Sequence, residues 1–268
     1  MNYRHTYHAG NFADVAKHFA VVCVLHYLRK KDAAFAVIDS HAGCGAYDLS
    51  GPEASRTGEA AEGIARLTNI NGGPAALATY LELAKGARYP GSPLLAARLL
   101  RPQDRLVAIE KHPEDAAALA AALRPYPKAR VEEADGYRRL LALVPPPERR
   151  GLILIDPPYE SPGEFCDAAR AVAAAYRRFA TGIYLIWFPV KSAAEANGFC
   201  GEVLASGAAK VLRLDIARRH VVAGKLNAAG LLLLNPPWQF EPDMRASLDL
   251  FLPRLECEAR FDWLAGVP

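Results

Sequence analysis

The sequence lacks closely spaced cysteines. Its five cysteines are scattered, and no two of them have the C-x-x-C spacing of a zinc or redox site. Their odd number argues against a complete disulfide framework, which favours a reducing compartment. Long apolar runs are also missing, and no cationic segment followed by an apolar one opens the chain. We therefore expect a soluble, cytoplasmic protein that does not enter a membrane.

A strong charge of one sign is lacking as well. The formal net charge of +3 permits a nucleic-acid partner without requiring one, because phosphate binding depends on local basic groups. Three local basic pairs occur, at Arg149–Arg150, Arg177–Arg178 and Arg218–Arg219. Each pair alone is more typical of a solvated surface than of an RNA contact. The charge therefore does not decide whether the binding partner is a nucleic acid.

The sequence does contain a large core and an alternation of strands and helices. Apolar residues make up 51% of the 268 residues, which is enough for one large domain with an insertion. Ala- and Leu-rich helical segments separate most of the predicted strands, as in an α/β fold with a mostly parallel sheet. The link before the last strand is too short for a helical crossover, so that strand is expected to be antiparallel. The seven predicted strands span residues 34–41, 104–110, 129–135, 151–156, 181–188, 209–217 and 229–235.

One connection between strands is too long for a simple crossover. Residues 47–88 contain helical pieces broken by a glycine turn, and we predict an inserted helical subdomain there. The main domain would then comprise residues 1–46 and 89–268. After the insertion, a helix is expected over 93–101, with Ser92 as its N-cap. Another amphipathic helix is expected ahead of the sheet.

Acidic residues and glycines follow the predicted strands. Ligands of open parallel sheets bind beyond the carboxyl ends of the strands. The first strand is followed by His41 and a glycine turn at Gly43, and the second ends in Glu110, an acceptor suited to ribose hydroxyls. The third ends near Asp135, which could accept from the amino group of an adenine. Each acid alone is more typical of a surface or capping residue, but together they predict a site for an adenosine-bearing cofactor.

The fourth strand ends in Asp156-Pro157-Pro158-Tyr159, a pattern suited to reaction at the exocyclic amine of a base. Such an amine is a poor nucleophile, and an acceptor side chain and a proline carbonyl could each take one of its N–H hydrogens. Tyr159 could stack on the base once it has left its own stack. A methyl sulfonium placed in line would then react through positioning and electrostatics. A turn after a strand is the alternative interpretation of this tetrad.

A similar run, Asn235-Pro236-Pro237-Trp238, follows the last predicted strand. An antiparallel strand would end at the edge of the sheet opposite to the cofactor. We therefore interpret this copy as a structural turn whose Trp238 packs against the following helix, and Asp156 as the site.

Several longer stretches carry a resemblance to a known family. They include "YRHTYHAGNFADVAKH", "DSHAGCGAY", "YPGSPLLAARLLR", "ADGY", "RRGLILIDPPYE" and "LLLLNPPW". In this order they resemble the RlmJ family, the large-subunit ribosomal RNA adenine-N6 methyltransferases of bacteria, over nearly the whole chain. The resemblance implies a Rossmann-like class I methyltransferase fold with a helical insertion and S-adenosyl-L-methionine as cofactor. The implied substrate is an adenine of naked or partly assembled 23S ribosomal RNA, and we expect a monomer without a metal.

The resemblance also assigns roles to single residues. Asp156 would be the catalytic acceptor, together with Pro157 and Tyr159, and Tyr3 would meet the RNA. The implied cofactor-binding residues are His18, His41, Ser92, Glu110, Asp135, Gly136 and Asp156. From the residues alone, His18 is more typical of a packed or solvated histidine. Ser92 is first of all an N-cap, although a helix start facing the site could also hold the cofactor carboxylate.

Other functions stay open from the residues alone. A DNA adenine-N6 methyltransferase would use the same tetrad, although residues 47–88 are few for a DNA-recognition domain. A non-catalytic RNA-binding protein of this fold would not be expected to keep the full set of strand-end residues. A dehydrogenase is disfavoured because the dinucleotide glycine pattern is absent. The preference for RNA over DNA rests on the resemblance.

Overall fold

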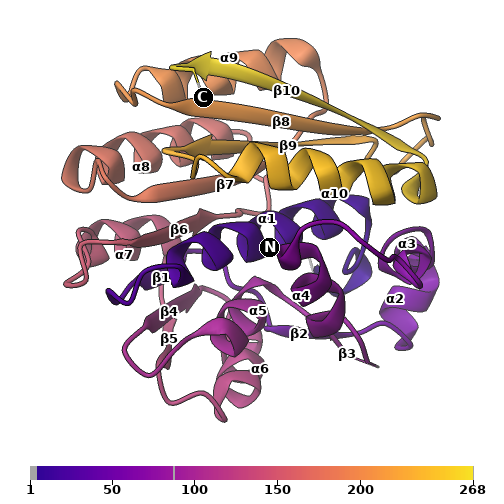
Figure 1. Ribbon diagram of the computed structural model, residues 1–268, viewed down its shortest axis with the longest axis horizontal. Coiled ribbons are helices and arrows are strands. Elements are labelled where there is room, and N and C mark those ends of the chain that lie inside the picture. Colours follow the sequence, from indigo (N-terminus) through magenta and orange to yellow (C-terminus); the bar gives the residue numbers. More distant parts are fainter. Residues whose placement is uncertain (1–4, 87, 268) are drawn as a thin grey trace.

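A central eight-stranded sheet organises the molecule, which a computed structural model describes over residues 5–86 and 88–267. Its strand order is β10-β8-β9-β7-β6-β1-β4-β5, and helices flank it (Figure 1). The strands are β1 (Ala36–Asp39), β4 (Arg105–Glu110), β5 (Ala129–Glu133), β6 (Gly151–Ile155), β7 (Ile183–Pro189), β8 (Val211–Arg218), β9 (Ala228–Leu234) and β10 (Cys257–Ala265). All seven predicted strands are present. The prediction of seven strands is nevertheless one short, because β10 extends the sheet.

Strand direction creates one functional edge. Strands β5, β4, β1, β6 and β7 are parallel to one another. Strand β9 runs antiparallel to both β7 and β8, as expected, so β8 has the same direction as β7. The carboxyl ends of all these strands except β9 therefore meet at one side of the sheet, which we call the carboxyl edge.

Alternate side chains of the central strands enter two separate cores, one on each face of the sheet. Val37 and Leu152 belong to one core, and Ile38 and Ile153 to the other. The first core also receives α1 (Phe12–Arg29), α4 (Ala75–Leu83), α5 (Ser92–Leu99), α6 (Pro113–Leu123) and α10 (Phe240–Leu255). The second receives α7 (Gly136–Leu143), α8 (Glu164–Arg178) and α9 (Ala193–Leu204). Within the described residues, no helix is long and apolar enough to cross a bilayer.

Helix α1 is buried on almost every side. The side chain of Asn11 accepts hydrogen bonds from the N–H groups of Ala13 and Asp14 and so caps the helix. The helix packs against α4, α5 and α10 as well as against the sheet. The expected amphipathic pattern is therefore wrong for this helix, because neighbours cover the face that would otherwise meet water. As a result, its polar residues Lys17 and His18 are buried.

The long connection begins and ends in a two-stranded antiparallel sheet of β2 (Ala46–Asp48) and β3 (Arg88–Pro90). Between these strands lie α2 (Pro52–Thr57), α3 (Glu59–Glu62), the 3-10 helix η2 (Ile64–Leu67) and α4. Leu77 and Tyr80 of α4 lie in the same core as α1. The division of the chain into a main domain and an inserted subdomain stays a prediction.

Helix α5 has a different cap from the predicted one. Gly91 is the N-cap, and Ser92 is the first residue of the helix. The prediction of Ser92 as N-cap is therefore wrong. Its hydroxyl instead donates to the carboxylate of Asp39, 2.7 Å away, at the end of β1.

The second diproline run follows β9 at the edge opposite to the carboxyl edge, since Leu234 pairs with Tyr184 near the start of β7. Asn235 has a φ of 54° and donates to the carbonyls of Ala180 and Gly182. Trp238, by contrast, is 75% exposed. Its predicted packing against the following helix is wrong, because α10 turns residues from Phe240 onward into the core and leaves Trp238 outside.

Candidate active site

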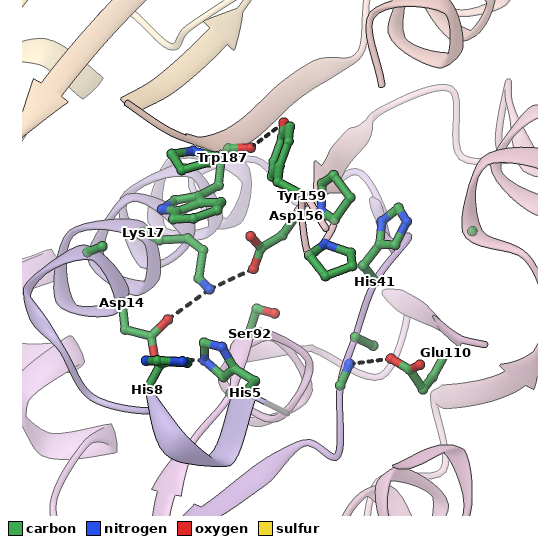
Figure 2. Close-up of a pocket in the computed structure, with 18 of the residues that line it drawn as sticks. His5, His8, Asp14, Lys17, His41, Ser92, Glu110, Asp156, Tyr159 and Trp187 are labelled. Carbon is green, nitrogen blue, oxygen red and sulfur yellow. Dashed lines mark hydrogen bonds and ion pairs between the residues drawn. The ribbon is translucent and has the colours of Figure 1, made fainter. Parts of the chain in front are cut away.

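A cavity of about 380 Å³ opens at the carboxyl edge (Figure 2). Its lining comes from the N-terminal segment, from α1 and from the turns after β1, β4, β5, β6 and β7. Nine of the ten residues predicted for the site line it: His18, His41, Ser92, Glu110, Asp135, Gly136, Asp156, Pro157 and Tyr159. The tenth, Tyr3, lies outside the described residues. The structure thus brings the predicted set together, while the role of each member stays a prediction.

Asp156 occupies the middle of this cavity because of its place in the chain. It follows directly after β6, whose five residues are all buried between the two helical layers. Its side chain is 16% exposed, and its Oδ2 lies 2.6 Å from Nζ of Lys17. No described residue donates a hydrogen bond to the other oxygen, Oδ1. The carboxylate is therefore fixed on one side and keeps an acceptor for a ligand on the other.

Lys17 joins two carboxylates across the cavity wall. Its Nζ also lies 2.8 Å from Oδ1 of Asp14, and both side chains are almost fully buried (Figure 2). Burial alone would lower the pKa of Lys17, but the charges of Asp14 and Asp156 raise it above its ordinary value. Lys17 is therefore a buried ammonium group with two partners. The sequence did not predict this residue at the site.

Asp14 organises the start of α1. Its Oδ2 accepts hydrogen bonds from the backbone N–H of Gly10 and, at 2.9 Å, from Nε2 of His5. Burial would raise the pKa of Asp14, but His5 and Lys17 hold it well below its usual range. The N-terminal segment is thereby tied to the same ionic network that holds Asp156.

A second acidic group, Asp39, lies at the end of β1. It is almost completely buried, and it accepts hydrogen bonds from the hydroxyl of Ser92 and, at 3.4 Å, from the N–H of His41. Burial raises the pKa of Asp39 to about 7, assisted by the charge of Asp156 and opposed by the bond from Ser92. Ser92 lines the cavity, but it already donates its hydroxyl proton to a protein partner.

Glu110 connects β4 to the glycine turn after β1. Its Oε2 accepts from the N–H of Gly43 and its Oε1 from the N–H of His112, both at 2.8 Å. Each carboxylate oxygen can accept more than one hydrogen bond, so both retain acceptor capacity for a ligand. Gly43 has a φ of 60°, a conformation that glycine adopts without strain.

Asp135 and Gly136 form the start of α7. Asp135 caps this helix by accepting from the N–H of Arg138 and lies 3.3 Å from Nζ of Lys111. A Cβ at Gly136 would come within 2.1 Å of the carbonyl oxygen of Ser40. Only glycine fits there, so α7 packs directly against the loop after β1.

The two predicted histidines differ in their access to the cavity. The ring of His41 packs edge-on against Tyr137, and burial lowers the pKa of His41 to about 4. His18 is 1% exposed, its Nδ1 lies 2.8 Å from the hydroxyl of Tyr89, and burial lowers its pKa to about 3. Both imidazoles are therefore neutral at pH 7. His18 has the packed environment that is typical of a core histidine, although it touches the cavity.

Two aromatic residues form the wall beside Asp156. The hydroxyl of Tyr159 donates to the carbonyl of Trp187 at 2.9 Å (Figure 2). The ring of Tyr159 also packs against Phe165 and Phe199 and is only 6% exposed. Trp187 on β7 lines the same cavity and is less buried. Tyr159 therefore lines the cavity with most of its ring packed against protein, Trp187 adds a second aromatic side chain, and stacking of Tyr159 on a base stays a prediction.

The missed residues are those whose partners lie far away in sequence. Lys17 and Asp156 are separated by 139 positions, and no local pattern connects them. The spacing of Asp14 and Lys17, which places both on one face of a helix, was the available signal. Trp187 lies in a predicted strand but was not expected to reach the site. Lys191 and Leu226 also line the cavity and were not predicted.

Both the sequence and the fold of this chain resemble those of known proteins. The family model described as "Ribosomal RNA large subunit methyltransferase D, RlmJ" matches residues 32–265. "Ribosomal RNA large subunit methyltransferase J" of Escherichia coli is 41% identical over 91% of this chain and 90% of its own length. The protein of that name from Haemophilus influenzae is 37% identical over 98% and 97%. A crystal structure of a Legionella pneumophila protein is 32% identical and superposes with a TM-score of 0.88, covering 96% of this chain and 98% of that one.

Proposed function

The chain belongs to the RlmJ family of ribosomal RNA large subunit methyltransferases, and from this premise we propose that it methylates N6 of an adenine in 23S ribosomal RNA, with S-adenosyl-L-methionine as the methyl donor. Membership supports rRNA methylation in general. The choice of an adenine amine and of 23S rRNA rests on the Asp156 tetrad and on the resemblance of the motifs. A cytoplasmic location follows from this substrate.

The residues of the cavity fit the proposed cofactor. Glu110 keeps acceptor capacity for ribose hydroxyls, and Asp135 keeps a partly exposed carboxylate for an adenine amino group. The missing side chain at Gly136 lets α7 and the loop after β1 approach closely, so both elements line the same cavity. When bound, S-adenosyl-L-methionine supplies a methyl group on a positively charged sulfur.

Asp156 and Pro157 would act on the target amine. Oδ1 of Asp156 can accept one N6–H of the adenine, and the carbonyl of Pro157 can accept the other. Both bonds increase electron density on N6, and they orient its lone pair in line with the methyl group. In the transfer, N6 would gain the methyl carbon as the bond from that carbon to sulfur breaks, and N6 would release a proton, for which Oδ1 is the proposed acceptor. Trp187 and Tyr159 supply the aromatic surface for the extruded base.

Lys17 acts through Asp156 and is therefore a positioning residue. Its ammonium group holds Oδ2 at 2.6 Å, which fixes the plane of the carboxylate and directs Oδ1 into the cavity. Asp14 holds the ammonium in turn. The single observation that carries the proposal is this fixed Asp156 in one cavity with Glu110 and Asp135.

A transfer assay tests the proposal. The purified protein is incubated with labelled S-adenosyl-L-methionine and either protein-free 23S rRNA or duplex DNA, and the product is digested and analysed by mass spectrometry. We expect N6-methyladenosine at one position of the RNA and no label in the DNA. Label in the DNA alone, or on another base, would contradict the proposal.

A further inference from the structure

The order of the strands divides the cavity into two halves. Glu110 ends β4 and Asp135 follows β5, both on one side of β6. Strands β7 and β8 end on the other side of β6, where Trp187 and Lys191 line the cavity. Asp156, at the end of β6, lies at the boundary. If the cofactor occupies the first half, the nucleic acid must approach Asp156 from the β7–β8 side.

That side carries a projecting loop of defined shape. Residues 219–227 connect β8 to β9 at the carboxyl edge, and we call them the β8–β9 loop. The side-chain amide of Asn227 holds the loop by accepting from the N–H of Val222 and donating to the carbonyls of Val222 and Lys225. The N–H of Arg219 donates to the carbonyl of Glu256. Leu226 of the same loop lines the cavity.

The basic residues around the loop fall into two classes. Arg218 and Lys225 both form ion pairs with the carboxylate of Glu62 on α3, at 3.0 and 3.5 Å. These contacts attach the loop to the long connection that contains α3. Arg219 and Lys191, in contrast, are exposed, and within the described part of the chain no acidic side chain forms an ion pair with either. Lys191 lies just after β7 and Arg219 just after β8, with β9 between them. Two strand spacings place their backbones roughly 10 Å apart.

We propose that Lys191 and Arg219 bind backbone phosphates of the substrate RNA next to the target adenosine, with the β8–β9 loop as a docking element. This inference rests on the proposed function, because it assigns the RNA-binding side of the same site. Lys191 lines the cavity and Arg219 lies two strands further along the same edge, and exposed cations without an acidic partner among the described residues are complementary to phosphates. Val221, 83% exposed at the tip of the loop, is available to contact a sugar or an unstacked base.

The proposal has a quantitative consequence. Each phosphate contact to single-stranded nucleic acid contributes about 0.7 to the slope of log affinity against log salt concentration. Removing both cations should therefore lower the magnitude of that slope by about 1.4. Taking the two contacts to contribute nothing at 1 M salt, this slope change corresponds to roughly a 25-fold loss of affinity at 0.1 M salt.

The experiment compares two double variants. Lys191→Ala/Arg219→Ala removes the proposed contacts. Arg177→Ala/Lys210→Ala removes two exposed cations at the opposite edge, at the end of α8 and before β8, and serves as the matched control. Binding to protein-free 23S rRNA is measured at several salt concentrations without cofactor, together with cofactor affinity and the KM for RNA. We expect a weaker Kd, a smaller salt slope and a higher KM for the first variant, with cofactor affinity close to wild type, and no such change for the control.

The outcomes separate this inference from the proposed function. Equal RNA affinity and salt slope in both double variants would overturn the inference while leaving methyl transfer by the wild type intact. A defect that occurs only with ribosomal particles, and not with protein-free RNA, would also overturn it, because the loop would then contact a protein. A wild type that binds RNA through these cations but transfers no methyl group would contradict the proposed function alone.

Discussion

At the scale of single residues, the site depends on a buried ammonium group. Lys17 lies between Asp14 and Asp156, and all three side chains are mostly shielded from water. Removing one partner of such a network leaves the others as buried charges without compensation, which is strongly unfavourable. The same ion pair holds the proposed acceptor in place. Both the stability of the fold and the rate of methyl transfer should therefore depend on Lys17.

Lys17→Met should lower the free energy of unfolding by about 3 kcal/mol because it leaves two carboxylates without their cation. Methyl transfer should fall by about 100-fold even at temperatures where the variant is folded, since Asp156 is no longer held. The control is Lys85→Met, which removes an ion pair to Glu82 whose side chains are 71% and 72% exposed. That change should lower the free energy of unfolding by less than about 1 kcal/mol. Equal stability and equal rates in both variants would contradict the role of Lys17.

His18 should make folding sensitive to acid. Its pKa is about 3 in the folded protein and about 6.5 in an unfolded chain, so below pH 6.5 the unfolded state binds the extra proton. Stability contributed by the neutral imidazole is thus complete above pH 6.5 and decreases as the pH falls toward 3. Between pH 7 and pH 5, denaturant titrations should show the wild type losing about 2 kcal/mol more than His18→Gln. Parallel losses in the two proteins would show that His18 is not buried as a neutral ring.

The acids at the strand ends could be predicted, whereas their protein partners could not. Glu110, Asp135 and Asp156 follow apolar strands, and parallel strands place their carboxyl ends together. Lys17 reaches Asp156 only because the buried helix α1 crosses the sheet, and no local pattern in the sequence encodes this contact. Residue type alone suggests a cap at Ser92, but its hydroxyl binds Asp39 instead. Here the tertiary partner decides the role.

At the scale of elements, α7 depends on a single position for its place beside the cavity. A methyl group at Gly136 would collide with the carbonyl of Ser40 and crowd the ring of His41. Gly136→Ala should therefore destabilise the protein by about 2 kcal/mol and weaken binding of S-adenosyl-L-methionine. Gly198→Ala is the matched control, because Gly198 lies in α9 and a Cβ added there would meet nothing within 4 Å.

Alanine at Gly198 should instead stabilise the protein by about 0.5–1 kcal/mol, through higher helix propensity. Thermal unfolding and calorimetric titration of the cofactor would measure both variants. Cofactor binding by Gly136→Ala with the affinity of the wild type would show that the close approach of α7 is not needed for the site.

Strand β10 shows why one element was missed. The segment Cys257–Ala265 alternates apolar and polar residues, the pattern of a strand with one solvated face. Nearly continuous apolar runs identify strands at the centre of a parallel sheet but not at its antiparallel edge. The alternation is present in the sequence and would have identified β10. The exposure of Trp238, in contrast, depends on how α10 packs and has no comparable signal.

At the scale of the whole molecule, the sheet order puts the residues proposed for the cofactor and those proposed for RNA on opposite sides of Asp156. The halves of the cavity come from β4 and β5 on one side and from β7 and β8 on the other, and α1 closes the cavity with Lys17. The fold class followed from the alternation of strands and helices. The assignment of the second half to RNA required the observed positions of Lys191 and the β8–β9 loop.

The measurement that tests the central claim most directly is the single-turnover rate of methyl transfer by Asp156→Asn, together with its affinity for S-adenosyl-L-methionine. Asparagine preserves the shape of the side chain but removes the charge that pairs with Lys17 and the group that accepts the N6 proton. We predict a rate at least about 100-fold lower even when the cofactor is saturating, and the measured affinity gives the concentration needed for saturation. A variant that binds the cofactor normally and still transfers the methyl group at the rate of the wild type would contradict the account.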